Sequence, residues 1–400
     1  MHSILLALAL SLVVSVSAAA GMVDDCADGS DPPRSIEACT AAIASGRWSG
    51  KGLAWAYYNR GNSHDRLGRV EQAIADFDAA LRLDPNYALA YVHRGNAHGG
   101  LGQYERAIAD LDQAIRLNPD IARAYYSRGI AHARLDQHLL AIADYVRAID
   151  LNPGLALAHR IRGDSYAALG LHAHAVADYD AAIRLNQEDA MAYFGRGIAH
   201  ARLRQHQYAI ADYDRAIELD PGVALAYRIR GDSYAALGRH ALAVADYDEA
   251  IRRDPDLASA HSSRGNVYLV LGQHERAIQD NQTAVRLDPN AAHWHGLAWV
   301  RFVVGENEQA LRDIDKALSL DPEDDDAVDT RAHVLAALGR TDEAFAAFEH
   351  AVALGGTTRA RAYQEALARH GYGTVADGDW DTASRTALKT CLENGCRLIE

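Results

Sequence analysis

A repeat of 34 residues runs through most of this 400-residue chain and constrains its fold more than any other feature. The dipeptide Arg-Gly returns at this step, beginning at residues 60, 94, 128, 162, 196, 230 and 264. A period of this length is typical of architectures in which each unit is one supersecondary element that packs against its neighbours. The sequence therefore predicts a stacked array rather than a single globular core.

Each unit has the pattern of two short helices. In the first unit, residues 54–67 form an amphipathic stretch that ends at Gly68, and glycine commonly terminates a helix. Residues 70–83 form a second stretch, which Asp84-Pro85 ends because proline does not continue a helix. Helices of this length are marginal alone in water, so their stability must come from stacking on neighbouring units.

The repeat resembles the tetratricopeptide repeat family. The resemblance implies an all-α fold, a right-handed superhelical solenoid of paired helices, with nine repeats over residues 54–358. The chain departs from the family in placing arginine before the glycine, and Ala298 replaces that glycine in the eighth unit, where we expect a local irregularity. The signature positions in the first unit are Tyr57, Gly61, His64, Leu67, Gly68, Ala73, Phe77, Ala80 and Pro85.

The amino-terminal residues predict export. Residues 4–16 are apolar and too short to span a membrane, and small residues follow at positions 18 and 20, as at a signal-peptidase site. We expect a signal peptide over residues 1–20, a periplasmic or secreted protein, and no membrane insertion after cleavage. An uncleaved anchor is the alternative.

The four cysteines fall into two pairs that are close in sequence, Cys26 with Cys39 and Cys391 with Cys396. In an oxidising compartment each pair would form a disulfide, whereas a cytosolic protein would keep four free thiols. We expect residues 21–53 to form a capping segment with half a repeat, held by its disulfide.

Resemblance to the family implies that the first helices line a concave groove where a protein or peptide ligand binds. The aromatic, cationic and acidic side chains at these positions would suit a peptide with hydrophobic and charged anchors. The alternative is that they are solvated helix faces. The candidate groove residues are Tyr58, Asn62, Arg66, Asn96, Tyr126, Arg134, Arg160, Asp164, Phe194, Arg202, Arg228 and Asp232.

Two further columns follow the period and predict architecture. The arginine of each Arg-Gly pair recurs in step with aspartates such as Asp76 and Asp110, which predicts ion pairs between the two helices of a unit. Histidines also recur in step, but stacked units hold equivalent atoms on the order of 10 Å apart, too far for one zinc ion. We expect half-buried packing and no metal site at His138, His172, His206, His240 and His274.

Residues 359–400 form a segment that we expect to lie outside the period, with helices over residues 359–370 and 382–393. It is similar to the small peptidoglycan-binding module, with serine at position 384 where that module has threonine. This resemblance implies a small helical fold and peptidoglycan as a further partner, and the alternative is a polar cap for the array. The matching residues are Gln364, Leu367, Gly371, Tyr372, Asp377, Gly378, Trp380, Arg385, Ala387 and Leu388.

Charge and motifs narrow the class of function. With 54 acidic and 40 basic side chains, the net charge of −14 argues against binding nucleic acid through bulk charge. No phosphate loop, nucleophile elbow or zinc-protease motif is present, so the sequence predicts neither catalysis nor a cofactor. We expect a non-enzymatic scaffold that binds a protein partner. The alternatives are a cell-wall binding protein whose repeats act as a spacer, and a cryptic hydrolase or transferase.

Overall fold

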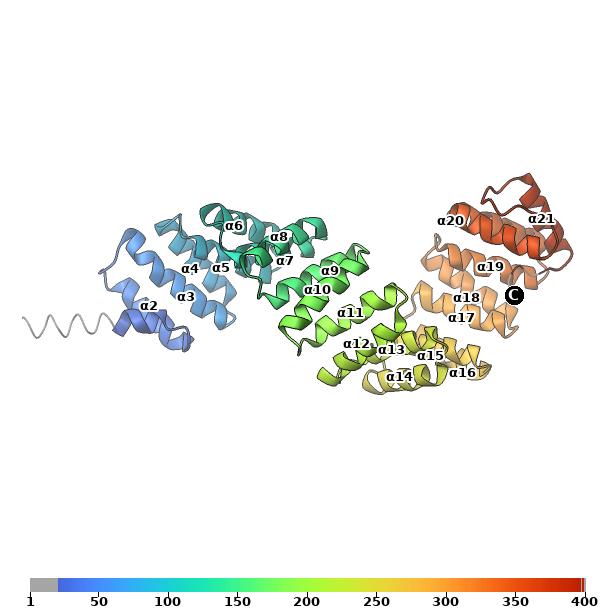
Figure 1. Cartoon of the computed structure of the whole chain (residues 1–400), viewed down its shortest axis with the longest axis horizontal. Coiled ribbons are helices and arrows are strands. Elements are labelled where there is room, and N and C mark those ends of the chain that lie inside the picture. The colour runs from blue at the N-terminus through green and yellow to red at the C-terminus, as the bar shows by residue number, and fades with distance from the viewer. Residues whose placement is uncertain (1–20, 397, 399–400) are drawn as a thin grey trace, which may run out of the picture. The chain divides into compact units, whose positions relative to one another are not determined.

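The computed structural model describes residues 21–396 and residue 398, and this part of the chain is helical, without strands (Figure 1). The predicted signal peptide lies outside the described residues. No helix of the described part is long and apolar enough to cross a membrane. The all-α fold class predicted from the period is confirmed.

Helices follow one another along the described chain in pairs, two to each 34-residue repeat. The first helix has 13 residues, and the second has 14 in the first eight repeats. The pairs are α3 (Ala54–Arg66) with α4 (Val70–Leu83), α5 (Ala88–Gly100) with α6 (Tyr104–Leu117), α7 (Ala122–Arg134) with α8 (His138–Leu151), α9 (Ala156–Ala168) with α10 (His172–Leu185), α11 (Ala190–Arg202) with α12 (His206–Leu219), α13 (Ala224–Ala236) with α14 (His240–Arg253), α15 (Ala258–Val270) with α16 (His274–Leu287), α17 (Ala291–Val303) with α18 (Asn307–Leu320), and α19 (Asp325–Ala337) with the first part of α20 (Thr341–Arg369).

The chain divides into two compact units, residues 1–203 and 204–400. The first unit contains the repeats up to α11, and the second begins with α12 and contains the remaining repeats and the carboxyl-terminal segment. The 34-residue period gives no sign of this division, because it continues without change through residue 203. The two units are described separately below.

In repeats one, three, four and six, the two helices touch where the glycine of Arg-Gly faces an aromatic ring, whereas Gly95 faces Leu111 and Gly265 faces Asn281. A Cβ atom on Gly129 would lie 2.5 Å from Cε1 of Tyr145, and one on Gly231 would lie 2.7 Å from Cε1 of Tyr247. Both tyrosines are only 1% exposed. The glycine therefore lets the ring fill the space between the two backbones.

The arginine of an Arg-Gly pair links two repeats where the preceding repeat supplies a second aspartate. Arg128 donates from Nε and Nη2 to both carboxylate oxygens of Asp144 in its own repeat, at 2.9 and 2.6 Å. Its Nη1 donates to Asp112 of the preceding repeat at 2.5 Å. The predicted ion pairs are confirmed in repeats one to four, six and seven. Where a second carboxylate is present, the arginine forms a clamp between two repeats. The contacts to the preceding repeat are Arg94 to Asp78, Arg128 to Asp112, Arg196 to Asp180, Arg230 to Asp214, Arg264 to Asp248 and Arg331 to Asp315.

One clamp in the first unit is incomplete, and this leads to a stability prediction. Arg162 binds Asp178 in its own repeat, but the position 16 residues before it holds Val146, a side chain that is 38% exposed. We expect Val146→Asp to raise the free energy of unfolding by about 0.5 to 1 kcal/mol, because it supplies the missing carboxylate. Denaturant unfolding checks this against Val146→Asn, which offers an acceptor without charge. Equal stability of the two variants would contradict the prediction.

The eighth repeat is regular within its helices, so the irregularity expected there is wrong for the helices. Helices α17 and α18 have the usual 13 and 14 residues. The step from α15 to α17 is 33 residues rather than 34. The difference falls in the loop 288–290, which is one residue shorter than the loop before α15. The arginine has moved as well, since Arg301, one helical turn after the Arg-Gly position, donates to Asp313 at 2.5 Å.

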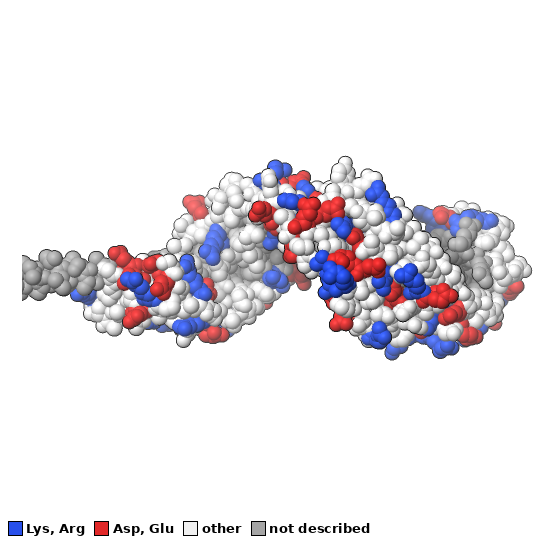
Figure 2. Space-filling model, turned by 90° about the horizontal axis from the view of Figure 1, so that it is seen from below, with Lys and Arg blue, Asp and Glu red and all other residues white. Residues whose placement is uncertain are grey.

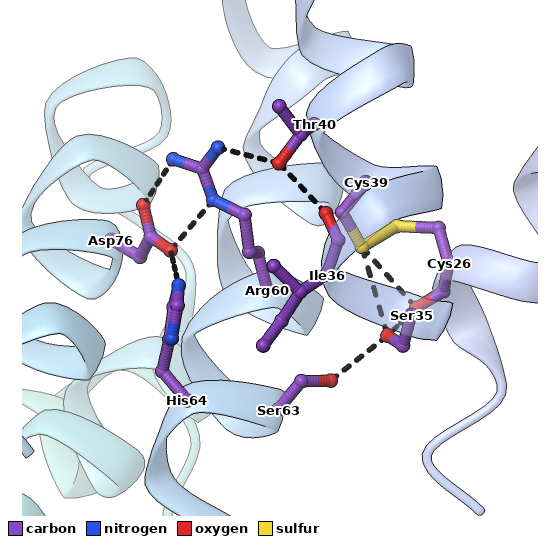
Figure 3. The surroundings of a disulfide bond; sticks show 9 residues. All are labelled: Cys26, Ser35, Ile36, Cys39, Thr40, Arg60, Ser63, His64 and Asp76. Atoms are coloured by element: carbon purple, nitrogen blue, oxygen red, sulfur yellow. Dashed lines mark hydrogen bonds and ion pairs between the residues drawn. A yellow bond between two sulfur atoms is a disulfide. The ribbon is translucent and has the colours of Figure 1, made fainter. Parts of the chain in front are cut away.

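The amino-terminal cap of the first unit is helix α2 (Pro32–Ala44), which packs against α3 (Figure 3). A disulfide joins Cys26 to Cys39 beside it. The hydroxyl of Thr40 on α2 accepts a hydrogen bond from Arg60 Nη1 at 3.2 Å, the bond that a preceding repeat's aspartate would otherwise accept. The cap therefore satisfies the first arginine of the clamp series in place of a missing repeat.

The carboxyl-terminal segment continues the repeat rather than following it. Helix α20 is interrupted at Gly356, whose φ is +60°, and its second part lies 34 residues after α19. The Arg359 guanidinium binds Asp325 at 2.8 Å, and the Tyr363 hydroxyl donates to Asp329 at 2.5 Å, each pair being 34 residues apart. This part of α20 therefore packs on α19 as the first helix of a further, incomplete repeat would, although we expected the period to end after Gly356.

The residues that resemble the peptidoglycan-binding module hold this segment together. The Gln364 side chain is 1% exposed, donates to the Asp377 carboxylate at 3.1 Å and accepts from the Gly378 amide at 2.8 Å. Trp380 Nε1 donates to Glu349 on the first part of α20 at 2.5 Å. The other positions are structural as well. Leu367, Ala387 and Leu388 are buried, Gly371 has a positive φ, Arg385 pairs with Glu349 and the Tyr372 hydroxyl accepts from Asn394.

The last helix, α21 (Thr382–Glu393), packs on α20 and is followed by a disulfide between Cys391 and Cys396. Leu392 and Leu398 are each 7% exposed and belong to the hydrophobic core of the last repeats. The end of the described chain therefore packs against the last repeats of the second unit, beside the disulfide.

The histidine column has a packing role in most repeats. His138, His172, His206 and His240 are half-buried at the start of the second helices, while His274 is exposed. Among the described residues, the one group of three side chains placed to share a metal ion is Asp324, Asp325 and Asp326. Arg359 binds two of these carboxylates, so they serve an ion pair.

Candidate functional site

The first-helix face of repeat one is aromatic and contacts the next repeat. The ring of Tyr58 lies 4.8 Å from that of Tyr87 and 5.4 Å from that of His93, between ring centroids. Burial lowers the pKa of His93 to about 4, so this imidazole is neutral at neutral pH. Tyr58 therefore packs within the array and offers only part of its ring to a ligand.

Two other candidates in repeat one contact or face the chain itself. The Arg66 guanidinium donates to the carbonyl oxygen of Gly29 in the amino-terminal segment. Asn62 is half-buried one turn earlier on α3, and its Oδ1 is buried without a hydrogen-bond partner. This end of the first unit is therefore already occupied by its own cap.

A hollow between α5 and α7 brings together two predicted groove residues, Asn96 and Arg134. It has a volume of about 410 Å³, and Tyr104 and Ser127 also line it. The hollow exists because α5 ends in Gly99-Gly100, where other repeats carry side chains. It is small and open, and it is suited to one polar side chain of a partner.

In repeat four the predicted residues Arg160 and Asp164 are already paired. They lie on consecutive turns of α9 with Arg160 Nη1 3.3 Å from Asp164 Oδ2, and Arg160 Nε lies 3.4 Å from Asp189 of the next repeat. The Tyr179 hydroxyl donates to the other oxygen of Asp164 at 2.7 Å. Burial and the adjacent Asp164 carboxylate raise the pKa of Tyr179, so its hydroxyl remains a donor.

The second unit repeats this arrangement in repeat six. Arg228 Nη1 donates to Asp232 at 2.7 Å, and the Tyr247 hydroxyl donates to Asp232 at 2.9 Å. A ligand would have to compete with these bonds before it could use either charge. These residues lie on the predicted face, but they stabilise the repeats.

The remaining candidates lie on the same face in the first unit. Tyr126 is half-buried with its ring 6.4 Å from that of Tyr145, and Phe194 is half-buried on α11. Arg202 is exposed in the last turn of α11.

A hollow on this face lies in the second unit, over the first helices of repeats seven, eight and nine (α15, α17 and α19). It consists of two adjoining parts of about 440 and 560 Å³. Both parts are lined by Leu269, Val270 and Trp299, which form the floor that joins them. We call it the Trp299 groove.

One part of the Trp299 groove is apolar. Trp299, Phe302 and His333 form a chain of ring contacts, at 5.8 Å between the first two centroids and 6.5 Å between the last two. Val270, which is part of the shared floor, is 68% exposed. The opposite wall comes from the carboxyl-terminal segment and consists of Leu392, Cys396 and Leu398.

The other part is polar and acidic. It is lined by Ser262, Asn266 and His295 together with Asp326 and Asp329 of α19. Burial lowers the pKa of His295, so it carries no charge at neutral pH. Although burial opposes it, contacts from His333, Tyr363 and Arg359 lower the pKa of Asp329 and keep it ionised.

The sequence-based list of groove residues ended at Asp232 and missed this groove. The signal was available, because Asn266, Trp299 and His333 continue the column of Asp232 at steps of 34, 33 and 34 residues. Val270 continues the column of Arg66 and Arg202 in the same way. What the period could not show is that the end of the chain folds back to form a wall.

On the face shown in Figure 2, basic and acidic side chains are interspersed and no large area carries one sign. This agrees with the clamps, in which each arginine lies between carboxylates. Electrostatic recognition on this protein therefore depends on local clusters, such as the acidic part of the Trp299 groove.

Comparison with protein families gives two matches, both described as tetratricopeptide repeat. One model matches residues 54–87. A second matches four consecutive segments, and the two together cover well over half of the chain. The four segments are residues 92–156, 158–224, 230–292 and 295–357.

The chain is also similar to solved structures, of which one supports the same fold at a TM-score of 0.50. The Cut9–Hcn1 hetero-tetramer of the APC/C is 15% identical, with 82% of this chain and 81% of that chain covered and a TM-score of 0.50. A tetratricopeptide repeat protein from Parabacteroides merdae is 20% identical, with 62% and 98% covered and a TM-score of 0.47. YrrB, described as a protein with an unusual peptide-binding site, is 27% identical, with 48% and 96% covered and a TM-score of 0.42. The search of curated proteins found no match.

Proposed function

The chain belongs to the tetratricopeptide repeat family, and from this premise we propose that it is a non-enzymatic scaffold that binds a peptide segment of a partner protein in the Trp299 groove. Paired helices stacked in this way present their first helices to a partner without using any residue of the repeat core. The fold supports protein partners in general, and the choice of the groove is our proposal.

One observation carries this choice. The Trp299 groove joins an apolar hollow to a polar one across a floor of three side chains. An apolar anchor with polar groups at its edge is the usual composition of the centre of a protein interface. By contrast, the charged residues predicted from the sequence in repeats four and six are bonded to one another.

We further propose that the protein is exported to the periplasm or secreted. Two features support this. The apolar run of residues 4–16 is followed by small residues, and all four cysteines are paired in disulfides. Disulfides persist in oxidising compartments and are rare in the cytosol.

We assign the carboxyl-terminal segment the role of a cap for the array. Its module-like residues Gln364, Asp377 and Gly378 bond to one another, and Trp380 binds the last complete repeat. A cap covers the helix surface that the last complete repeat would otherwise expose, as terminal repeats must. Sedimentation of the full chain with purified peptidoglycan would favour glycan binding instead.

Site-specific photo-crosslinking in the native host tests the proposed function. A photoreactive residue at Val270, on the floor of the groove, is expected to capture a partner protein in the periplasmic or secreted fraction. The control is the same residue at Val375, which is 73% exposed and lies outside the groove. Equal capture at both positions would contradict the groove, and adducts confined to the cytosol would contradict export.

A further inference from the structure

The two parts of the Trp299 groove differ in chemistry, and this difference specifies a partner. We propose that the bound peptide segment has an aliphatic or aromatic side chain in the apolar part and a lysine or arginine side chain against Asp326 in the acidic part. This inference rests on the proposed function and names the class of segment that the groove selects.

The apolar part selects an apolar anchor. Its lining includes Leu269, Trp299, Phe302 and Val303, and Val303 is 47% exposed. Exposed aliphatic and aromatic side chains that face a concave surface gain free energy when another apolar group removes them from water. The volume of about 440 Å³ is large enough for the side chain of a leucine or phenylalanine.

The wall of this part makes the anchor site concave. Leu392, Cys396 and Leu398 line the hollow opposite the first helices, and the Cys391–Cys396 disulfide closes the loop that carries Leu392. The hollow remains open with this wall in place. The carboxyl-terminal segment therefore completes the anchor site and does not fill it.

The acidic part selects a cation. Four carboxylates lie at the start of α19, on Asp324, Asp325, Asp326 and Asp329, against the single guanidinium of Arg359. The local charge is therefore negative even after these ion pairs are counted. The Asp326 side chain is 73% exposed, which leaves it accessible to a partner. A cation placed against such a cluster gains specificity through charge complementarity.

The shared floor lets one bound peptide segment occupy both parts of the groove. Because Leu269, Val270 and Trp299 line each hollow, an anchor in the apolar part places its neighbouring residues over the acidic part.

A peptide selection on the full mature chain, with its disulfides intact, tests the inference. The probe is a phage library of random short peptides, followed by binding measurements with the enriched peptides in synthetic form. Two exposed substitutions test the inference: Val270→Arg changes the floor that both parts share, and Asp326→Lys changes the acidic part alone. Matched controls are Val375→Arg, and Asp342→Lys, which reverses an exposed charge in the first turn of α20. Circular dichroism checks that all four variants fold.

We expect enriched peptides to combine apolar and basic residues. Asp326→Lys should weaken their binding about tenfold, with a smaller loss at high salt than at low salt, and Val270→Arg should weaken it at least as much. The controls should bind like the unchanged chain. Peptides that lose binding with Val270→Arg but lack a basic residue or ignore Asp326→Lys would overturn this inference and leave the proposed function standing. Peptides unaffected by both variants, or an absence of enriched peptides, would overturn both.

Discussion

Asp144→Asn is expected to lower the free energy of unfolding by about 3 kcal/mol, because it breaks a clamp at its buried end. Asp144 is 5% exposed and receives two hydrogen bonds from Arg128, at 2.6 and 2.9 Å. Asparagine has nearly the same volume but no charge, and its amide group would face donors of the guanidinium. The half-buried arginine would then lose its strongest partner.

Asp112→Asn is the matched control for this prediction. Asp112 accepts a single bond from the same arginine, and its side chain is 35% exposed, so water replaces much of what is lost. We expect a cost below about 1 kcal/mol. Denaturant unfolding followed by circular dichroism measures both variants. Similar losses for the two would show that burial does not decide the strength of these ion pairs.

Gly129→Ala should cost about 2 kcal/mol, because the new methyl group has no space. It would lie 2.5 Å from Cε1 of Tyr145, and that ring is almost wholly buried between the helices of the repeat. Relief requires α7 to move away from α8 or the ring to leave its position. Either movement disturbs the contact with the neighbouring repeats as well.

Gly100→Ala provides the opposite case in the adjacent repeat. No atom lies within 4 Å of a Cβ placed on Gly100, which is exposed at the end of α5. We expect this variant to be as stable as the unchanged chain or to gain up to about 1 kcal/mol, because alanine favours helix more than glycine does. Thermal and denaturant unfolding of the pair tests the packing argument. The packing argument is wrong if Gly129→Ala is as stable as Gly100→Ala.

The charged part of the predicted site shows where sequence reasoning reached its limit. Arg160 and Asp164 were correctly placed on the first-helix face, and their spacing of four residues already permits a bond along one helix. The additional donor, Tyr179, comes from the second helix of the same repeat. Only the packing of the two helices shows that this carboxylate is already bonded.

The groove itself depended on contacts that no period encodes. The column through Asn266, Trp299 and His333 could be read from the sequence, but its apolar wall comes from Leu392 and Leu398. These residues lie outside the complete repeats, and the hollow that they line with α17 joins parts of the chain that are far apart in sequence. Their position follows from the path of the chain after α20.

The sequence by itself determined the helix pairs, the glycine at each close contact and the ion pair within each repeat, because all of these recur at the 34-residue step and involve residues close in sequence. Only the tertiary structure showed which carboxylate of the preceding repeat completes a clamp and that Tyr363 bonds to Asp329 one period earlier. It also showed that the end of the described chain forms a wall of the Trp299 groove. The physical reason is that local propensity and spacing act within one repeat, whereas these features depend on how one repeat, or the end of the chain, packs against another.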